Sequence, residues 1–473
     1  MRGQTNTRIA LQAFFYLCYD FYMERFTHNY EGLFNKQEGV PDEPIELKGI
    51  DAKWYKRFVV LYFDDYEKLA GEDRESLEKA FLTGEMDNPK LDYPKLETFN
   101  IEERESKLLE LKHEILTQEP NPIIQKIYRA KINEVVAQLR MLSATKRGDD
   151  RAFQKYNEFI YGKPAPEHMG YVVDSFRKKA EAVLVKGDEE QKNAAARILE
   201  ILSKAPEMSS EMVAPDVLPR LEDNSQPVQS MGEIMHEVWH KLQNQGVYDW
   251  SVVISPNPAF SASQEDKQIK IPEKTENRIE KGTFSAQSLA ALIAHEVSTH
   301  AVRRYRGERS KLQLLGLGFD RYLRGEEGIA RYRQQLVRGE SEFAGLGYYF
   351  NIGLAVGYFD GVKRDFRRTF EVVRDYKIMT MKDSPDRLKK ADHAAWVSCV
   401  RIFRGTTCDT PGAVYSKDLA YIGNREIWTL VSKVSDATMT FDTGKFDPTN
   451  STHIEWLTQL GILDEDLPTS DPL

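Results

Sequence analysis

The chain has 473 residues, a formal net charge of −9 and 41% hydrophobic residues, which is typical of a globular protein long enough for two or three domains. Its three cysteines, Cys18, Cys399 and Cys408, are too few and too widely spaced for a disulfide framework or a CxxC zinc site. No stretch reaches the roughly 18 apolar residues of a membrane span. We therefore expect a cytoplasmic protein with neither a membrane nor a nucleic acid as its partner.

The first hundred residues contain no motif that assigns them a role, so we treat 1–100 as an N-terminal region of unknown role. Residues 9–19 form an apolar run like the core of a signal peptide, but Gln12 interrupts it and no small-residue cleavage site follows. The run predicts an amphipathic or buried helix. Further along, Pro89 and Pro94 predict an extended connector.

A helical domain is predicted at 101–225. Apolar periodicity predicts three helices, at 101–117, 121–144 and 166–187. The last of these ends at Gly187, and glycine is a common C-cap residue. The segment 204–227 is rich in Ser, Pro and Met, which predicts a linker at the end of this domain.

After the linker, 226–473 is predicted to form one further domain. Short apolar or alternating runs predict strands at 250–256 and 267–273. Helical patterns follow at 285–305, 326–338, 341–356, 364–380 and 386–404. The predicted fold class is α+β, predominantly helical, with a small sheet beside the helix at 285–305.

The charge is unevenly distributed along the chain. From 301 to 404 there are 22 Lys and Arg against 13 Asp and Glu, a local balance of +9 that leaves −18 for the remainder. Such a run usually forms the solvated faces of helices. The alternative is that one half of the molecule attracts an acidic substrate, and both interpretations stay open here.

The sequence contains two histidine motifs, and the first, HEVWH at 236–240, has the usual HExxH spacing. Its histidines share one helix face and its Glu is placed as a general base. However, the apolar stripe of this helix runs beside the histidines, through Met231, Ile234, Met235, Val238 and Leu242. We therefore expect His236 and His240 to lie on a wet polar edge, partly exposed and without metal.

The second motif, HEVSTH at 295–300, has one residue more. On a regular α-helix His295 and His300 point roughly 140° apart, but a π-type turn or a break before His300 brings them to one face. The preceding SLAALIA is apolar nearly all round, which predicts a buried helix. A buried Glu296 then needs compensation, which either a metal ion or a buried hydrogen-bonded network supplies.

The segment ALIAHEVSTHAVR, followed by LLGLGFDRYLRGEEGIA, resembles the tyrosine carboxypeptidase family of zinc metallopeptidases, which has microtubule-associated and bacterial members. That family carries HExxxH and a downstream Glu–Gly–Leu–Ala, which reads EGIA at 327–330 here. The segments 153–164 and 401–424 are also similar to elements of the family. The resemblance extends over about 105–460 and leaves the first hundred residues unplaced.

The resemblance implies that 226–473 is a catalytic domain with a Zn²⁺ cofactor. It implies zinc ligands at His295, His300 and Glu327, which leave a fourth position for water, and a general base at Glu296. The adjacent Glu326 lies about 100° away on a helix, so it cannot share the direction of Glu327. The structural alternative for Glu326 is a favourable charge near a helix N-terminus.

A carboxypeptidase must also bind the C-terminal carboxylate, for which Arg and Lys are best suited. The candidates are Lys270, Arg401, Arg404 and Lys417. Tyr421 is a candidate donor to the oxyanion formed during hydrolysis. Each has a structural alternative, which is an ion pair for the cations and core packing for the tyrosine.

By this resemblance the protein is a zinc metallocarboxypeptidase that releases tyrosine or another aromatic residue from an acidic, tubulin-like protein tail with a free C-terminus. Besides a classical HExxH enzyme built on HEVWH at 236–240, two alternatives stay open. One is a non-catalytic zinc-containing module that binds proteins, which peptide turnover would distinguish. The other is a zinc endopeptidase, whose cleavage would survive blocking of the substrate's C-terminal carboxylate.

Overall fold

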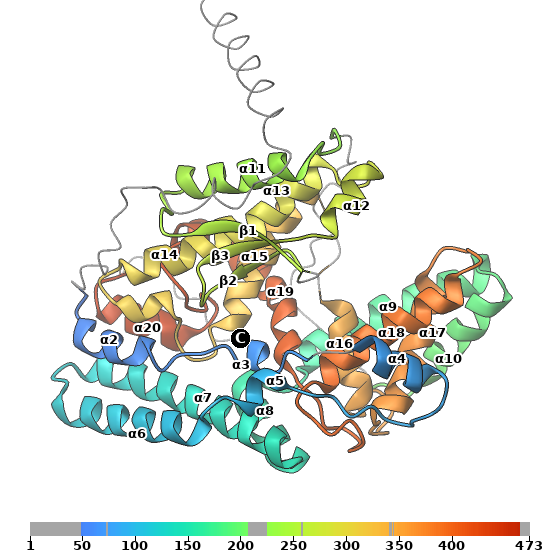
Figure 1. The fold of residues 1–473 in the computed structure, drawn as a ribbon, viewed down its shortest axis with the longest axis horizontal. Coiled ribbons are helices and arrows are strands. Elements are labelled where there is room, and N and C mark those ends of the chain that lie inside the picture. The colour runs from blue at the N-terminus through green and yellow to red at the C-terminus, as the bar shows by residue number, and fades with distance from the viewer. Residues whose placement is uncertain are drawn as a thin grey trace, which may run out of the picture. The chain divides into compact units, whose positions relative to one another are not determined.

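Figure 1 shows the computed structural model, which describes residues 49–71, 74–206, 225–256, 259–339, 343 and 345–463. The chain divides into two compact units, each described separately below. Among the described residues the smaller unit covers 225–302, and the larger unit covers 49–206 and 303–463. The three consecutive domains expected from the sequence remain a prediction. The apolar run at 9–19 and most of the predicted linker lie outside the described residues.

The smaller unit contains a three-stranded sheet. Its strands are β1 (Ser251–Ser255), β2 (Ser261–Ser263) and β3 (Gln268–Pro272). The order is β1-β3-β2, with β1 parallel to β3 and β2 antiparallel to it. Val252 of β1 and Ala262 of β2 both face Ile269 in the register, and Ile269 is fully buried. The two predicted strands are confirmed, whereas β2 was not predicted.

Helices cover this sheet in the same unit. They are α11 (Met231–Asn244), α12 (Thr275–Glu280), α13 (Ala286–His295) and the π-helical segment η2 (Glu296–Ala301). The buried stripe of α11 includes Ile234, Val238 and Leu242, and α11 packs against β1 and η2. Strand β2 also contacts η2. The predicted α+β class, mostly helical with a small sheet beside the helix that carries HEVSTH, is therefore confirmed.

In the larger unit, the regular elements among the described residues are all helices. Its N-terminal part contains α2 (Ala52–Val59), α3 (Asp65–Lys68), α4 (Arg74–Leu82), α5 (Pro94–Glu97), α6 (Ile101–Gln118), α7 (Pro122–Arg147), α8 (Asp150–Tyr161), α9 (Pro166–Lys186) and α10 (Glu189–Leu202). Its C-terminal part contains α14 (Val302–Glu308), η3 (Gln313–Gly316), α15 (Leu323–Arg338), α16 (Leu346–Ala355), α17 (Phe366–Thr380), α18 (Arg387–Phe403), η4 (Lys417–Gly423), α19 (Asn424–Lys433), η5 (Ala437–Thr440) and α20 (Ser451–Gln459).

Helix α7 shows how local sequence sets these elements. Asn121 caps it by accepting hydrogen bonds from the backbone N–H groups of its first turn, Pro122 occupies the first helical position, and Gly148 ends it in the left-handed conformation. Its fully buried side chains, such as Tyr128 and Leu139, contribute to the main apolar core, and α7 packs against α6 and α8.

The long helices follow their predicted bounds, and the differences are local. The residue after α9 is Gly187, as predicted, but its φ of −74° is not the left-handed conformation of a glycine cap. The short helix α5 lies inside the connector predicted to be extended, because Pro94 is favourable at a first helical position. No helix among the described residues is long and apolar enough to cross a membrane.

Candidate metal centre

The HEVSTH motif lies where the regular α-helix gives way to a wider turn. Helix α13 ends at His295, the π-helical segment η2 spans Glu296–Ala301, and α14 follows directly. The hydroxyl of Thr299 donates to the carbonyl of Ala294, five residues earlier, at 3.0 Å. This geometry confirms the predicted π-type turn, which compensates for the extra residue between the two histidines.

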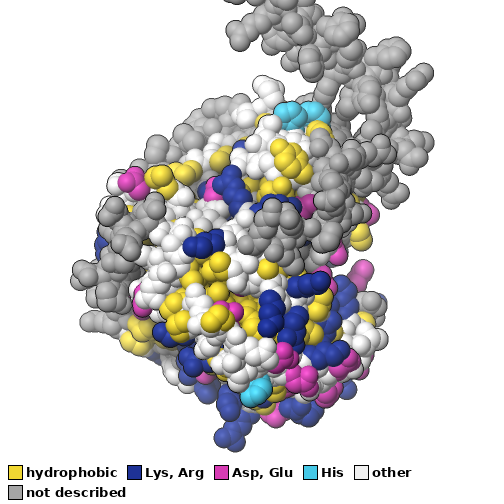
Figure 2. Space-filling view, turned by 90° about the vertical axis from the view of Figure 1, so that its left-hand side faces the viewer, with side chains coloured by type: hydrophobic (Ala, Val, Ile, Leu, Met, Phe, Trp, Pro, Cys, Tyr) yellow, Lys and Arg dark blue, Asp and Glu magenta, His cyan; other side chains and the backbone are white. Residues whose placement is uncertain are grey.

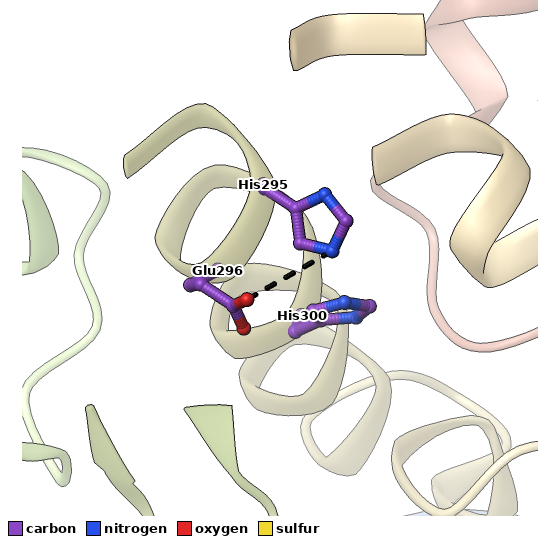
Figure 3. Close-up of side chains that lie close together, drawn as sticks. All are labelled: His295, Glu296 and His300. Carbon is purple, nitrogen blue, oxygen red and sulfur yellow. Dashed lines mark ion pairs between the residues drawn. The ribbon is translucent and has the colours of Figure 1, made fainter. Parts of the chain in front are cut away.

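The turn brings the three chemically active side chains of the motif together. Figure 3 shows the rings of His295 and His300 and the carboxylate of Glu296 close to one another beside the helix. The ring centroids are 5.0 Å apart, and Nε2 of His295 lies 3.8 Å from Oε1 of Glu296. All three residues are buried, with 7%, 9% and 9% of the surface of His295, Glu296 and His300 exposed. The motif therefore forms a compact, shielded group of potential ligands.

This group has the chemistry of a transition-metal site. Each of the three residues offers one ligand atom, and these atoms lie within 4.8 Å of one another. Two ligand atoms on one tetrahedral zinc ion lie roughly 3.3 Å apart, so a movement of about 1.5 Å or less closes the group around an ion. Imidazole nitrogen and carboxylate oxygen are both ordinary zinc ligands. The residues present therefore fit a zinc ion.

Strand β2 holds the carboxylate of Glu296 in place. The backbone N–H of Ala262 donates to Oε2 of Glu296 at 2.8 Å, which leaves Oε1 as the oxygen nearer to His295. Sequence reasoning missed this contact because Ser261–Ser263 is too short to show a strand pattern. A hydrogen bond from a backbone amide fixes the direction of a carboxylate. Glu296 is thus oriented by the sheet as well as by its own helix.

Glu327 lies on α15, in the larger unit, and its predicted role as third ligand stays a prediction. The glycine that follows it has a structural reason. A Cβ on Gly328 would lie 2.9 Å from the backbone carbonyl of Gly423, so α15 and the end of η4 approach each other backbone to backbone. The same contact brings Tyr421, two residues before Gly423, near Glu327. Burial and, after it, the Glu327 carboxylate raise the pKa of Tyr421 well above its ordinary value. The EGIA motif therefore joins α15 to the segment that carries Tyr421.

A comparison with known families adds an independent finding. The model of the microtubule-associated tyrosine carboxypeptidase family matches residues 79–339, which is more than half of the chain. The chain belongs to this family. The match includes both HEVSTH and EGIA, and it ends before the late block at 401–424. A search of curated proteins finds no match. Membership of a family of carboxypeptidases makes the chain a peptidase by class.

Next to the EGIA motif of this carboxypeptidase, Glu326 forms a buried ionic group. It is 1% exposed, with Nη1 of Arg303 at 2.5 Å and Nζ of Lys445 at 3.2 Å. The guanidinium of Arg303 also donates to the carbonyls of Gly444 and Phe446. Glu326 lies in the first turn of α15, as expected, and it is in addition the counter-charge of two buried cations. Sequence spacing could not show that two distant cations converge on it.

Glu326→Leu is expected to lower the free energy of unfolding by about 3–5 kcal/mol, because it leaves Arg303 and Lys445 buried without their counter-charge. Urea denaturation followed by circular dichroism measures this. Glu110→Leu on the exposed face of α6 is the control, with an expected change within about 0.5 kcal/mol. Equal stability of the two variants would show that the buried group contributes nothing.

Tyr421 is held so that its hydroxyl hydrogen is available to another group. Nη2 of Arg401 donates to the Tyr421 hydroxyl oxygen at 3.2 Å, so the phenol must direct its own O–H elsewhere. Burial and the Glu327 carboxylate both raise the pKa of Tyr421, which keeps the phenol protonated at neutral pH. The arrangement suits a hydrogen-bond donor.

Three of the four predicted carboxylate-binding cations have acidic partners within the protein. Lys270 lies 2.6 Å from Asp266, Arg401 makes two hydrogen bonds to Asp418 at 2.5 and 2.8 Å, and Lys417 lies 3.1 Å from Asp64. Arg404 instead places its guanidinium 3.9 Å from the ring centroid of Tyr66, and its Nη1 is buried without a hydrogen-bond partner. Arg401, Arg404 and Lys417 all lie near this one tyrosine ring.

Lys417 also lines a pocket of about 320 Å³ in the larger unit, together with Tyr161, Arg324 and Tyr349. Burial alone lowers its pKa, but the carboxylates of Asp64 and Asp65 outweigh burial and raise it. Lys417 therefore stays charged, and that charge is already balanced by its two neighbours. This balance makes it a weaker candidate for binding a substrate carboxylate.

The basic excess between 301 and 404 is partly used in ion pairs with acids from elsewhere in the larger unit. These pairs are Arg306 and Arg333 with Asp442, Arg387 with Asp188 and Glu190, and Arg401 with Asp418. On the face shown in Figure 2, Lys and Arg side chains lie beside Asp and Glu as well as beside hydrophobic side chains. The local balance of +9 therefore overstates the positive charge available to a substrate.

The other histidine motif, HEVWH, lies on the exposed side of α11. The side chains of His236 and Glu237 are 49% and 57% exposed, and His240 is exposed as well, with Nδ1 2.9 Å from the side-chain nitrogen of Asn244. The predicted stripe of apolar residues is buried on the opposite side. The expected exposure is confirmed, and the absence of bound metal stays a prediction.

A His236→Ala, His240→Ala variant is therefore expected to keep its metal content and its peptidase activity within about twofold, because surface substitutions away from a site usually change little. Metal analysis and peptide turnover, compared with the parent protein at equal concentration, measure this. Loss of both properties in a variant with an unchanged circular dichroism spectrum would move the metal centre to α11.

Proposed function

We propose that the protein is a zinc-dependent carboxypeptidase that releases tyrosine or another aromatic residue from an acidic protein tail similar to that of tubulin. The observation that carries this proposal is the π-helical turn, which gathers His295, Glu296 and His300 in a chain of the tyrosine carboxypeptidase family. The histidine spacing is unsuitable for metal binding on a regular helix, but the π-helical turn makes these residues a compact group of potential ligands. Nothing in the folding of an apolar helix requires that arrangement.

The metal would be held by His295 and His300, with Glu327 as the third ligand and a fourth position left for water. Zinc bound there supplies a Lewis acid that polarises the scissile carbonyl. Glu296 takes a proton from the attacking water and delivers it to the leaving amine. The amide of Ala262 supports this role, because it holds Oε2 of Glu296 and leaves Oε1 for the transferred proton.

Tyr421 donates a hydrogen bond to the oxygen that gains negative charge during hydrolysis. The hydrogen bond from Arg401 supports this role, since it occupies the phenol oxygen as an acceptor and turns the O–H outward. The raised pKa of Tyr421 keeps that donor protonated at the pH of the reaction. Removing one such donor typically costs on the order of 10²–10³ in kcat.

We place the protein in the cytoplasm, as a protein that acts on other proteins. Both described cysteines, Cys399 and Cys408, are free and buried, which is consistent with a reducing compartment. Burial raises the pKa of each thiol above its ordinary range, so neither is suited to be a metal ligand or a nucleophile.

The test uses zinc-loaded protein and one acidic peptide that ends in tyrosine, prepared with a free C-terminal carboxylate and as the C-terminal amide. Release of free tyrosine from the acid alone is the expected result, detected by mass spectrometry. Internal cleavage of both peptides would favour the endopeptidase alternative. Tight binding without any cleavage, across a broad library of acidic peptides, would favour a non-catalytic binding module.

A further inference from the structure

Arg331, in the larger unit, has no carboxylate as its hydrogen-bond partner. It lies where the proposed chemistry needs a cation to bind the substrate. Its Nη1 donates to the side-chain carbonyl of Gln334 at 2.7 Å, and its Nε–H is buried without an acceptor. The residue is partly exposed. By contrast, Arg401, two of whose nitrogens bond to Asp418, has its charge balanced within the protein.

Arg331 also lies on the helix face that carries Glu327. The two residues are four positions apart on α15, so their side chains leave the helix about 40° apart and about 6 Å along its axis. In a peptide, the C-terminal carboxylate follows the scissile carbonyl by one residue, at most about 3.8 Å. With the length of one hydrogen bond added, a cation one helical turn from the proposed ligand Glu327 is at the right distance to bind that carboxylate.

Tyr421 connects Arg331 to the same site by a second route. The guanidinium of Arg331 lies 5.1 Å from the ring centroid of Tyr421, and the ring of Tyr348 lies 5.8 Å from that of Tyr421. Tyr421 also lies two residues before Gly423, whose backbone carbonyl would be 2.9 Å from a Cβ on Gly328, the residue after Glu327. One phenol is therefore adjacent to the proposed ligand and to this arginine, with a second aromatic ring beside it.

We infer that Arg331 binds the C-terminal carboxylate of the substrate, in place of Lys270, Arg401 and Lys417. The inference rests on the proposed function and adds its specificity-determining contact. A planar guanidinium can offer two parallel N–H groups to a carboxylate, and Arg331 is partly exposed and has the side-chain carbonyl of Gln334, not a carboxylate, as its hydrogen-bond partner. Arg404, which also lacks a carboxylate partner, is the rival anchor.

The experiment measures binding, so that it does not depend on turnover. The Glu296→Gln protein, loaded with zinc, is titrated with the acid and amide forms of one fluorescent, tyrosine-ending acidic peptide. This Glu296→Gln protein, the parent for the variants below, is expected to bind the acid form 10- to 100-fold more tightly than the amide form. Such a difference is on the order of one charge-assisted contact. Arg331→Met, added to this protein, is expected to remove that difference by weakening the acid form alone.

Two further variants define the interpretation. Arg333→Gln, which removes another guanidinium from α15, one that pairs with Asp442 at 2.8 Å, is expected to keep the full discrimination. Arg331→Lys is expected to keep part of it, since it retains the charge and loses the fork. Thermal melting curves that match the parent show that each variant is folded.

Discrimination that persists in Arg331→Met overturns the inference, as does its loss in Arg404→Met with retention in Arg331→Met. A parent that binds both forms equally also overturns it. The proposed function is tested by a separate result. If the protein with Glu296 intact releases no residue while binding still discriminates through Arg331, the hydrolase proposal fails and the carboxylate contact stands.

Discussion

Replacing Glu296 by Gln is expected to lower the turnover of a tyrosine-ending peptide by on the order of 10²–10⁴, while the protein stays folded and keeps its zinc. Glutamine has nearly the same shape, and its side-chain carbonyl can still accept the hydrogen bond from Ala262. What it loses is the ability to take a proton. Peptide turnover, metal content and thermal melting measured on one preparation separate these effects.

The matched control for this substitution is Glu237→Gln, the same change in the exposed HEVWH motif. Its glutamate side chain is 57% exposed, and its replacement is expected to leave activity unchanged. The metal content of the Glu296 variant decides a further point. Because His295, Glu296 and His300 each offer a ligand atom to one close group, loss of zinc from Glu296→Gln would make Glu296 a ligand rather than the general base.

Replacing His295 and His300 together by Ala is expected to abolish both zinc retention and activity. The double variant removes two of three protein ligands, and such sites hold zinc through at least three. Metal analysis after dialysis against a weak chelator measures the loss. His236→Ala, His240→Ala is the control, since it removes two histidines at HExxH spacing from an exposed face. Full occupancy in the His295, His300 variant would rule out this metal centre.

Glu327→Ala extends the same measurement to the proposed third ligand. If Glu327 is a ligand, its loss is expected to weaken zinc binding by far more than the 10- to 100-fold typical of a residue outside the ligand set. Unchanged zinc affinity would leave Glu327 as a neighbour of Tyr421 that acts on its pKa. This outcome would also weaken the argument that places Arg331 one turn from a ligand.

The parts of the fold that the sequence predicted have a repeating pattern or a strong local signal. The helix expected at 101–117 is α6, Ile101–Gln118, because its apolar positions recur at helical spacing and Asn100 caps it. The π-type turn was predictable for a different reason. Two histidines five residues apart can bind one metal ion only if the helix widens to a π-type turn or breaks between them.

What sequence could not predict depends on partners far away in the chain. Strand β2 has only three residues and no alternation, yet its amide holds Glu296. The sequence suggested that Arg401 and Lys417 are cations of the right type, but it could not show that Asp418 and Asp64 balance their charge. Residue type indicates what a side chain can bind, and the fold decides whether it is already bound. The four-residue spacing between Glu327 and Arg331 indicates that they share a helix face, which composition alone does not reveal.

The contact between Gly328 and Gly423 has a mechanical consequence. A Cβ on Gly423 would lie 2.4 Å from the carbonyl oxygen of Arg324, and one on Gly328 would lie 2.9 Å from that of Gly423, so the two backbones approach closely at this point. Side chains can change rotamer and absorb a displacement, whereas two backbones in contact cannot. Glu327 and Tyr421, each within two residues of this contact, should therefore move as one rigid body. Any opening of the site to admit a protein tail would have to carry both of them together, with their separation preserved.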